Sequence, residues 1–524
     1  MRKLFLFILI NLILSGDLFA QYSPYNYTLQ KDKKLNKAFN DFSPAGNDIS
    51  DMIVLGDTIW VGSGRGLSLS TDNGNSWKNF YGDQTFGSEN ISAIADDHGT
   101  IWVATAHSVD INGQSLPEGS GLHYTTDNGL TWTSIPQPVD AQSDTIVTYG
   151  INHLRALPVT VAVQNLIYDI AFTPGTVWIA TFAGGLRKSN NMGKSWQRVV
   201  LPPDYLNSVK PSDTLNFCMQ PVSGKFCNEN NLNYRVFSVI STNDSTLYVG
   251  TADGINKSTD DGISWVKFTH TNQDSSISGN FIVALAYNNS TNTVWSASWQ
   301  AEGSTEFNAA SFSSNGGKTW NIILNDEKVH NFAFKGNQVI ALSDEGAFGT
   351  NDGGNSWINT TSIVDGRTGL ALATNVFYSG GTDNNTIWLG SDDGLVKFNE
   401  KGAMWFGDWQ IYFASKTLSS IGSSYAYPNP FSPKTEVLKI KYSTDGKSEP
   451  VTIRIFNFGM QYVRTIIQNA QRGNPTNVVD NSNGVIDYWN GKDDEGNIVP
   501  NGVYFYRIDV GSNKPIFGKI LVLQ

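Results

Sequence analysis

Two carboxylates, Asp51 and Asp169, occupy equivalent positions in two of seven short apolar segments that recur along the chain. The aligned position holds Asp51, Ala93, Asp169, Ser238, Ala284, Asn331 and Gly369. A pair of carboxylates held about 5–10 Å apart can hydrolyse a glycosidic bond, so these two are the candidates for catalysis. The alternative, which we favour, is that both bond to backbone groups or to water along a central axis.

Other signs of chemistry are weak. The six histidines show no ligand spacing, and no nucleophile elbow or phosphate loop occurs, so we expect neither a metal nor a cofactor. One stretch resembles part of a calcium loop, through Asp480, Ser482, Gly484 and Asp487. Its spacing is incomplete, and an ordinary turn rich in Asn and Asp is favoured.

The pattern Ser/Thr-x-Asp/Asn-x-Gly-x-Ser/Thr-Trp occurs six times and organises the middle of the chain. Its acidic or amide residue, glycine and tryptophan are Asp72, Gly74, Trp77; Asp127, Gly129, Trp132; Asn191, Gly193, Trp196; Asp260, Gly262, Trp265; Asn315, Gly317, Trp320; and Asp352, Gly354, Trp357. The Asp or Asn oxygen can accept N–H bonds within its own turn, and glycine permits positive φ. The tryptophan buries a large apolar surface, so the pattern predicts a structural hairpin turn.

Strand-like runs precede each copy, such as Thr-Ile-Trp-Val at 58–61 and again at 100–103. An eroded seventh copy keeps only Gly402 and Trp405. Seven units of four strands predict an all-β fold, with a seven-bladed β-propeller at 47–413 after an N-terminal extension at 21–46.

The repeated turn resembles the Asp-box, or bacterial neuraminidase repeat, of sialidases, sortilin-like receptors, some glycanases and photosystem II assembly factors. The resemblance implies a propeller in which the box is a structural turn away from the ligand. It stops at the box for the sialidases, because no Phe/Tyr-Arg-Ile-Pro motif occurs and their arginine triad cannot be placed. All but three tryptophans belong to boxes or the preceding strands, and of those three Trp299 could form a sugar platform.

Four long insertions interrupt the repeat, at 106–120, 136–164, 202–234 and 299–309. In an antiparallel four-stranded blade, the connections that hold them emerge on one face, opposite the box turns. Long loops on a rigid scaffold often carry binding sites, so we predict a ligand site on this rim above the second to fifth blades. Neutral variation of surface loops is the alternative.

A different pattern follows a small polar linker at 414–424. Strand-like runs over 425–524 predict an immunoglobulin-like β-sandwich. Tyr-Pro-Asn-Pro-Phe at 427–431, Trp-Asn-Gly-Lys-Asp at 489–493 and Gly-Val-Tyr-Phe-Tyr at 502–506 resemble the C-terminal sorting domains of type IX secretion cargo and the related domain of flagellar hook-capping proteins. The resemblance implies delivery by the outer-membrane secretion machinery of a Bacteroidota-like bacterium, with a passive spacer as the alternative.

The N-terminus has the pattern of a secretory signal peptide over 1–20. Arg2 and Lys3 precede an apolar run at 4–14, and Ala20 offers a small residue for cleavage. No later segment is apolar enough to span a membrane; a buried N-terminal helix is the alternative. In an oxidising compartment we expect Cys218 and Cys227 to form a disulfide rather than remain free thiols.

The formal net charge of −11 argues against a nucleic-acid partner, which needs a clustered basic surface. We therefore expect a secreted or cell-surface protein that binds a glycan or a protein, and a binding role is favoured over an enzymatic one. An extracellular glycoside hydrolase or lyase and an extracytoplasmic assembly factor are the alternatives.

Overall fold

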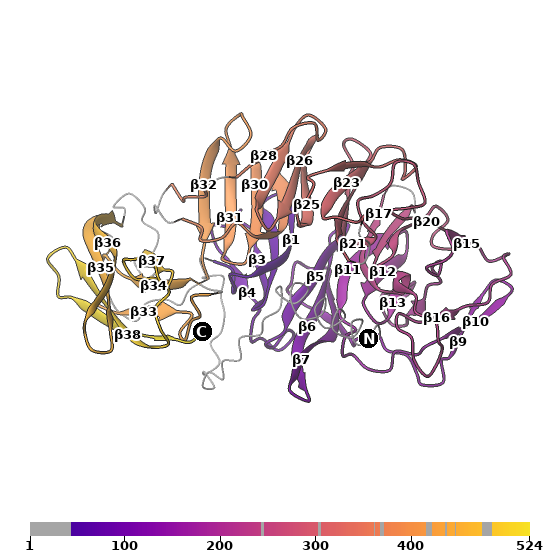
Figure 1. The fold of residues 1–524 in the computed structure, drawn as a ribbon, viewed down its shortest axis with the longest axis horizontal. Coiled ribbons are helices and arrows are strands. Elements are labelled where there is room, and N and C mark those ends of the chain that lie inside the picture. The colour runs from indigo at the N-terminus through magenta and orange to yellow at the C-terminus, as the bar shows by residue number, and fades with distance from the viewer. Residues whose placement is uncertain are drawn as a thin grey trace. The chain divides into compact units, whose positions relative to one another are not determined.

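The computed structural model describes residues 43–242, 246–301, 305–360, 362–366, 371–414, 422–434, 437–445, 447–473 and 485–524. The predicted signal peptide and most of the 21–46 extension and the 414–424 linker lie outside these residues. The chain divides into two compact units, Met1–Thr361 with Thr374–Gly407, and Ser362–Ala373 with Asp408–Gln524. The described residues form strands and one 3-10 helix, η1 (Leu232–Tyr234), which confirms the expected all-β class (Figure 1).

Seven sheets follow one another along the described part of the first unit, and apart from β15, which adds to the edge of the fourth sheet, each is built from strands that are neighbours in sequence. Their strands are β1 (Ile49–Leu55), β2 (Thr58–Ser63), β3 (Gly66–Ser70), β4 (Lys78–Asn79); β5 (Asn90–Asp97), β6 (Thr100–Ile111), β7 (Gln114–Thr125), β8 (Thr133–Ile135); β11 (Ile167–Thr173), β12 (Thr176–Thr181), β13 (Gly185–Ser189), β14 (Gln197–Arg198); β17 (Val236–Ser241), β18 (Leu247–Thr251), β19 (Gly254–Ser258), β20 (Trp265–Phe268); β21 (Phe281–Asn288), β22 (Thr293–Trp299), β23 (Ala309–Ser313), β24 (Asn321–Ile323); β25 (Val329–Lys335), β26 (Gln338–Ser343), β27 (Gly346–Thr350), β28 (Ile358–Asn359); and β29 (Phe377–Asp383), β30 (Thr386–Ser391), β31 (Leu395–Glu400). β32 (Gly407–Tyr412) begins where the chain passes into the second unit.

The first strand of each of these seven sheets carries the same one-residue bulge. β1 pairs Ile49 with Ser63 and Asp51 with Gly62, so Ser50 is left without a partner across the strand pair. The bulge recurs in β5, β11, β17, β21, β25 and β29. The register corrects one sequence assignment: the seventh residue equivalent to Asp51 is Ser379, because β29 begins at Phe377. Gly369, which the alignment placed there, lies outside the described residues.

The sheets pack against one another through their first strands and through tryptophans. β1 contacts β5, β5 contacts β11, and the series continues to β29, which contacts β1. A box tryptophan meets the second-strand tryptophan of the preceding sheet in the pairs Trp132–Trp60, Trp357–Trp295 and Trp77–Trp388. These large rings fill the space between sheets, as the sequence predicts for a buried tryptophan at this position.

Lysine side chains also join neighbouring sheets. In four sheets a lysine Nζ donates to a carbonyl of the next box turn: Lys78 to Gly129 (2.9 Å), Lys188 to Asp261 (3.4 Å), Lys257 to Gly316 (2.8 Å) and Lys397 to Asn73 (2.8 Å). Three of these ammonium groups also lie over an aromatic ring of their own sheet's second strand. These box turns are therefore stabilised by hydrogen bonds to the adjacent sheet as well as by hydrogen bonds within the turn.

The first three insertions contain strands. Insertion 106–120 extends the β6–β7 hairpin, whose strands pair from Ile101 to Ile111. Insertions 136–164 and 202–234 meet in a three-stranded sheet made of β9 (Ile146–Tyr149), β10 (Asn152–Ala156) and β16 (Cys218–Met219), while β15 (Ser208–Val209) pairs with β20. A disulfide joins Cys218 to Cys227. Arg187 on β13 holds Asp140 in a buried bidentate ion pair at 2.7 and 2.9 Å.

The second unit contains two sheets in its described residues. One has the order β33 (Ser424–Tyr427), β34 (Leu438–Tyr442), β37 (Val485–Trp489), and the other β36 (Tyr462–Arg472), β35 (Glu449–Asn457), β38 (Gly502–Val510), β39 (Ile516–Val522). The Asn429 side chain donates to Lys519 O and accepts from Leu521 N, both at 2.8 Å, so the Tyr-Pro-Asn-Pro-Phe motif binds the outer edge of β39. Asp487 accepts bonds from Tyr442 and Arg472; Asp480, Ser482 and Gly484 lie outside the described residues.

Candidate functional site

The bulges of the first strands build the wall of a cavity of about 450 Å³ in the first unit. All seven bulge residues line it, namely Ser50, Ser92, Tyr168, Phe237, Val283, His330 and Tyr378. In a regular strand, side chains alternate between the two faces, and the inserted residue breaks that alternation. The repeated bulge is therefore the local feature that directs one side chain per sheet towards the cavity.

Aromatic rings at and next to this wall contact one another in a series, which we call the aromatic arc. Its members are Tyr168, Phe237, Phe281, Trp299, His330 and Tyr378, with Phe182 as a branch beside Phe237, and contacting ring centroids lie 4.8–6.5 Å apart. Phe182 and Phe281 belong to the series but do not line the cavity. The third to seventh sheets supply these residues, whereas the first two contribute Ser50 and Ser92. The wall thus has an aromatic part, from the third to seventh sheets, that also contains Ser238, Ser241 and Asn331, and a polar part formed by Ser50 and Ser92 of the first two sheets.

Asp51 lies at the cavity beside the polar part of the wall. Its Oδ1 accepts from Met52 N at 2.8 Å, and its Oδ2 accepts from Ile94 N on β5 at 2.7 Å. The carboxylate therefore connects the first strands of two neighbouring sheets. Burial, with the nearby charge of Asp169, raises the pKa of Asp51 to about 7 against the opposing effect of these hydrogen bonds.

Asp169 repeats the arrangement between the third and fourth sheets. Its Oδ2 accepts from Ser238 Oγ and Val239 N at 2.8 and 2.9 Å, and its Oδ1 accepts from Ile170 N at 2.8 Å. Burial raises the pKa of Asp169 to about 6. Both oxygens of each candidate carboxylate are occupied by protein donors, which is the arrangement that the favoured alternative requires.

The box turns contain carboxylates of a different kind. Asp72 Oδ1 accepts from Ser70 Oγ and Ser76 N, both at 2.8 Å, and Oδ2 accepts from Ser76 Oγ. Burial would raise the pKa of Asp72, but the bonds from Ser76 and Ser70 outweigh it, so the pKa lies below its ordinary value. No box residue lines the cavity.

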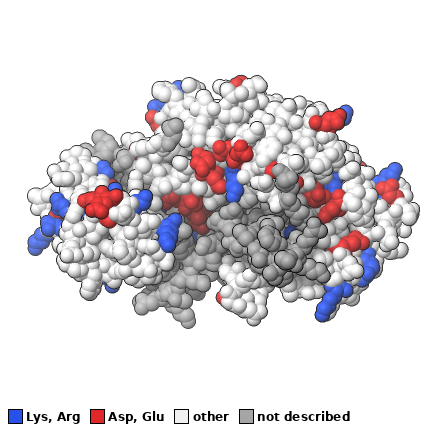
Figure 2. All heavy atoms as spheres, viewed as in Figure 1, with Lys and Arg blue, Asp and Glu red and all other residues white. Residues whose placement is uncertain are grey.

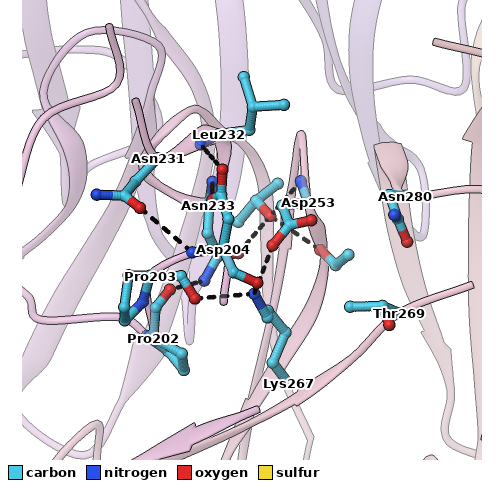
Figure 3. A network of polar contacts seen from close by, with 12 residues as sticks. Pro202, Pro203, Asp204, Asn231, Leu232, Asn233, Asp253, Lys267, Thr269 and Asn280 are labelled. Carbon is cyan, nitrogen blue, oxygen red and sulfur yellow. Dashed lines mark hydrogen bonds and ion pairs between the residues drawn. The ribbon is translucent and has the colours of Figure 1, made fainter. Parts of the chain in front are cut away.

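A buried network fixes the 202–234 insertion onto the fourth sheet (Figure 3). Lys267 Nζ donates to Pro203 O at 3.0 Å, to Asp204 O at 2.9 Å and to the Asp253 carboxylate. The Asp204 carboxylate in turn accepts from Leu232 N and Asn233 N at 2.8 and 3.0 Å. Every group in this network has a partner within the protein, so the insertion is attached as part of the scaffold.

The predicted rim site and the cavity overlap at one residue. Trp299, where the fourth insertion starts, lines the cavity, but no residue of the other three insertions does. Sequence reasoning missed Tyr168, Phe237, His330 and Tyr378 as site residues. The first three directly precede an aligned inner-strand position, and Tyr378 precedes Ser379, which the alignment did not include. Within the described residues, no group of three or more His, Cys, Asp or Glu side chains could hold a metal ion.

Comparison with known proteins supports the propeller fold. No protein-family model and no curated protein matches the chain. Among similar solved structures, an ancestral GH74 enzyme has a TM-score of 0.50 at 13% identity, covering 91% of this chain and 62% of the other. PorZ, an essential bacterial surface component of the type-IX secretion system of Porphyromonas gingivalis, gives 0.38 at 15% identity, covering 89% and 64%.

A third similar structure, YCF48 bound to D1 peptide, gives a TM-score of 0.39 at 13% identity, covering 67% of this chain and 92% of that one. All three are β-propellers, and the chain spans less than two thirds of the length of the first two. Within the described residues, no helix is both long and apolar enough to cross a membrane.

Proposed function

We propose that this chain is an exported, seven-bladed Asp-box β-propeller with a non-catalytic binding role, whose ligand occupies the cavity bounded by the aromatic arc. Seven consecutive sheets with the same bulge, and the contact of β29 with β1, support the blade count. The ligand is a glycan or a protein. The two-sheet second unit, with its Tyr-Pro-Asn-Pro-Phe motif on the edge of β39, would be an immunoglobulin-like sorting domain recognised by the outer-membrane secretion machinery.

The observation that carries a binding role is the aromatic arc itself. Apolar and aromatic walls with a few polar groups are the usual lining of ligand sites, and aromatic residues contribute most to binding energy. The hydrogen bonds of the two cavity carboxylates also favour binding over catalysis. Asp51 and Asp169 already accept hydrogen bonds that join neighbouring strands.

A glycoside hydrolase is the second candidate. Burial raises the pKa of Asp51 to about 7 and that of Asp169 to about 6, and such values suit general acid–base groups near neutral pH. The fold likeness to an ancestral GH74 enzyme fits this candidate as well.

One assay separates the two. The mature chain is tested against panels of polysaccharides and peptides, with bound ligand and released reducing ends scored together. We expect binding without product release, and we expect Trp299→Ala to weaken binding about tenfold or more. Phe406→Ala is the control, since this ring is 65% exposed and does not line the cavity. Release of reducing ends that disappears in Asp51→Asn or Asp169→Asn would replace the binding role by the hydrolase.

Export is tested separately. Deletion of 425–524 should leave the protein in the periplasm of its native host, detected by fractionation. Normal delivery of the shortened chain would contradict the sorting role.

A further inference from the structure

We infer that the group held in the cavity is a cation, namely the side chain of an arginine or lysine on a peptide or protein partner. The inference rests on the proposed binding role of the cavity and names the chemistry of its ligand.

The charge of the lining is of one sign. Asp51, Asp96 and Asp169 are among the lining residues, whereas none of those residues is a lysine or an arginine. The chain as a whole has a formal net charge of −11, and on the face drawn in Figure 2 the described Lys and Arg occur in small separate groups. A carboxylate-lined cavity without basic residues attracts cations and disfavours anionic ligands.

The polar part of the wall is rich in hydrogen-bond acceptors. Ser92, only 8% exposed, lines the cavity, and its Oγ has no hydrogen-bond partner among the described residues. The Ser50 hydroxyl already donates to Ile91 O at 2.8 Å, which leaves its oxygen to accept. A carboxylate can accept about four hydrogen bonds, so Asp51 and Asp169 retain capacity beyond those they make within the protein. Guanidinium and ammonium groups only donate, and they match such a surface better than sugar hydroxyls do.

The aromatic arc suits the rest of a basic side chain. Aromatic rings attract cations through their faces, and their apolar surface covers the methylene stem. Two rings of the arc already attract cations of this chain: Lys328 Nζ lies 5.7 Å from the Trp299 centroid, and the Arg235 guanidinium lies 5.5 Å from that of Phe182. Neither Lys328 nor Arg235 is among the residues that line the cavity.

The angles between the rings argue against a sugar platform. Trp299 meets His330 at 85°, His330 meets Tyr378 at 75°, and Phe281 meets Trp299 at 43°. Successive rings therefore do not form one flat surface on which a pyranose chain could lie, whereas a curved wall fits a single side chain.

The titratable groups on the lining are Asp51, Asp96, Asp169, Tyr168, Tyr287, Tyr378 and His330. Burial raises the pKa values of Asp51 and Asp169 to about 7 and about 6, so both carboxylates change charge between pH 5 and pH 8. Burial also raises the pKa of Tyr168 and Tyr378, which keeps both hydroxyls neutral. A cation binds the ionised carboxylates more tightly, so affinity should rise between pH 5 and pH 8.

The test compares two blocked pentapeptides, Gly-Gly-Arg-Gly-Gly and its citrulline analogue, which has nearly the same shape and no charge. Binding to the mature chain is followed by saturation-transfer NMR and titration calorimetry. We expect the arginine peptide to bind about tenfold more tightly, in line with the contribution of a charged hydrogen-bonded group. A third peptide, with lysine in place of arginine, should bind as well, and the affinity of both cationic peptides should fall at pH 5.

Asp51→Asn and Asp169→Asn should each remove most of this preference. Asp110→Asn is the matched control, because Asp110 is exposed at the tip of the β6–β7 hairpin and does not line the cavity. Trp299→Leu gives a second route, should either carboxylate variant fail to fold.

Equal affinity for the arginine and citrulline peptides would overturn the inference. So would an affinity for the arginine peptide that is unchanged in Trp299→Leu. A neutral oligosaccharide whose binding depends on Trp299 would also overturn it while leaving the proposed binding role in place. A different result would contradict the proposed binding role of the cavity. In that case a ligand from the wider panel would bind with an affinity that no cavity substitution changes.

Discussion

The aspartates of the box turns and those of the cavity accept similar hydrogen bonds and have opposite pKa shifts. Asp127, in the second box, accepts from Thr131 Oγ1, Thr131 N and Thr125 Oγ1 in an exposed turn, and these bonds lower its pKa to about 2. Asp51 accepts two backbone N–H bonds inside the first unit, where burial raises its pKa to about 7. Solvent access, rather than hydrogen bonding alone, decides the charge of each.

The difference in pKa distinguishes two structural roles of aspartate in this protein. A box carboxylate stays ionised at any physiological pH and serves a single turn. A cavity carboxylate joins two neighbouring strands, yet its charge can respond to pH or to a bound cation. The following substitutions test how far that separation holds.

The largest effect should come from a third kind of carboxylate, one that is buried but paired with arginine. Asp140 and Arg187 have side-chain exposures of 7% and 2%. Asp140→Asn leaves the guanidinium without a counter-charge, so we expect a loss of about 3–5 kcal/mol in the free energy of unfolding, measured with urea. Lys210→Met is the control, because it breaks an exposed pair with Asp213 and should change stability by less than about 1 kcal/mol. A small effect at Asp140 would show that burial is not decisive here.

Removing a box carboxylate should have a moderate effect. Asp72→Ala removes the acceptor of Ser70, Ser76 N and Ser76 Oγ, and we expect a loss of about 2 kcal/mol in urea unfolding. Affinity for any ligand of the cavity should stay unchanged, since Asp72 does not line it. A change in affinity would contradict the assignment of the boxes to structure alone.

The pH dependence of stability should have opposite signs in the two groups. Because the pKa of Asp51 is raised in the folded protein, its protonated carboxyl stabilises the fold. This contribution to the free energy of unfolding is complete below the pKa of the unfolded state, near 3.8, and is lost as the pH rises through about 7. Wild type should therefore lose stability relative to Asp51→Asn between pH 4 and pH 8. The lowered pKa of Asp127 has the reverse effect, with a contribution present above about 3.8 and lost as the pH falls through about 2.

Urea unfolding of wild type, Asp51→Asn and Asp127→Asn at pH 3, 5 and 8 measures both trends. Parallel curves for all three proteins would remove the distinction between the two groups.

The smallest effect should come from a box side chain outside the hydrogen-bond network. Leu130 is 78% exposed, and Leu130→Ser should change the free energy of unfolding by less than about 0.5 kcal/mol. A larger change would indicate a further contact for this turn.

The sequence predicted the strands and turns better than the site. Box turns and second strands carry strong local patterns, so their positions agree with the structure. The seventh inner strand was misplaced because β29 contains Gly380 and Gly381, which weaken a strand pattern. The packing explains Gly381, since a Cβ there would lie 2.5 Å from Val54 Cγ2 of the first sheet.

The aromatic arc was missed for a related reason. Inward-facing positions are predicted from the two-residue alternation of a strand, and the bulge residues of the arc break this alternation. Tyr168 and Tyr378 are therefore predicted to face outward. The bulge depends on pairing between strands, and a single sequence carries no direct record of pairing.

The lysine hydrogen bonds from one sheet to the box turn of the next sheet affect how the protein unfolds. In a repeat protein, stability is the sum of each repeat and its contacts with the next, and linear arrays fray from terminal repeats that need caps. Here the Lys397 bond to Asn73 links the seventh sheet to the first, so the two end sheets of the series support each other. Detaching either of them breaks two interfaces, which should make unfolding more cooperative than in an open array of equal length.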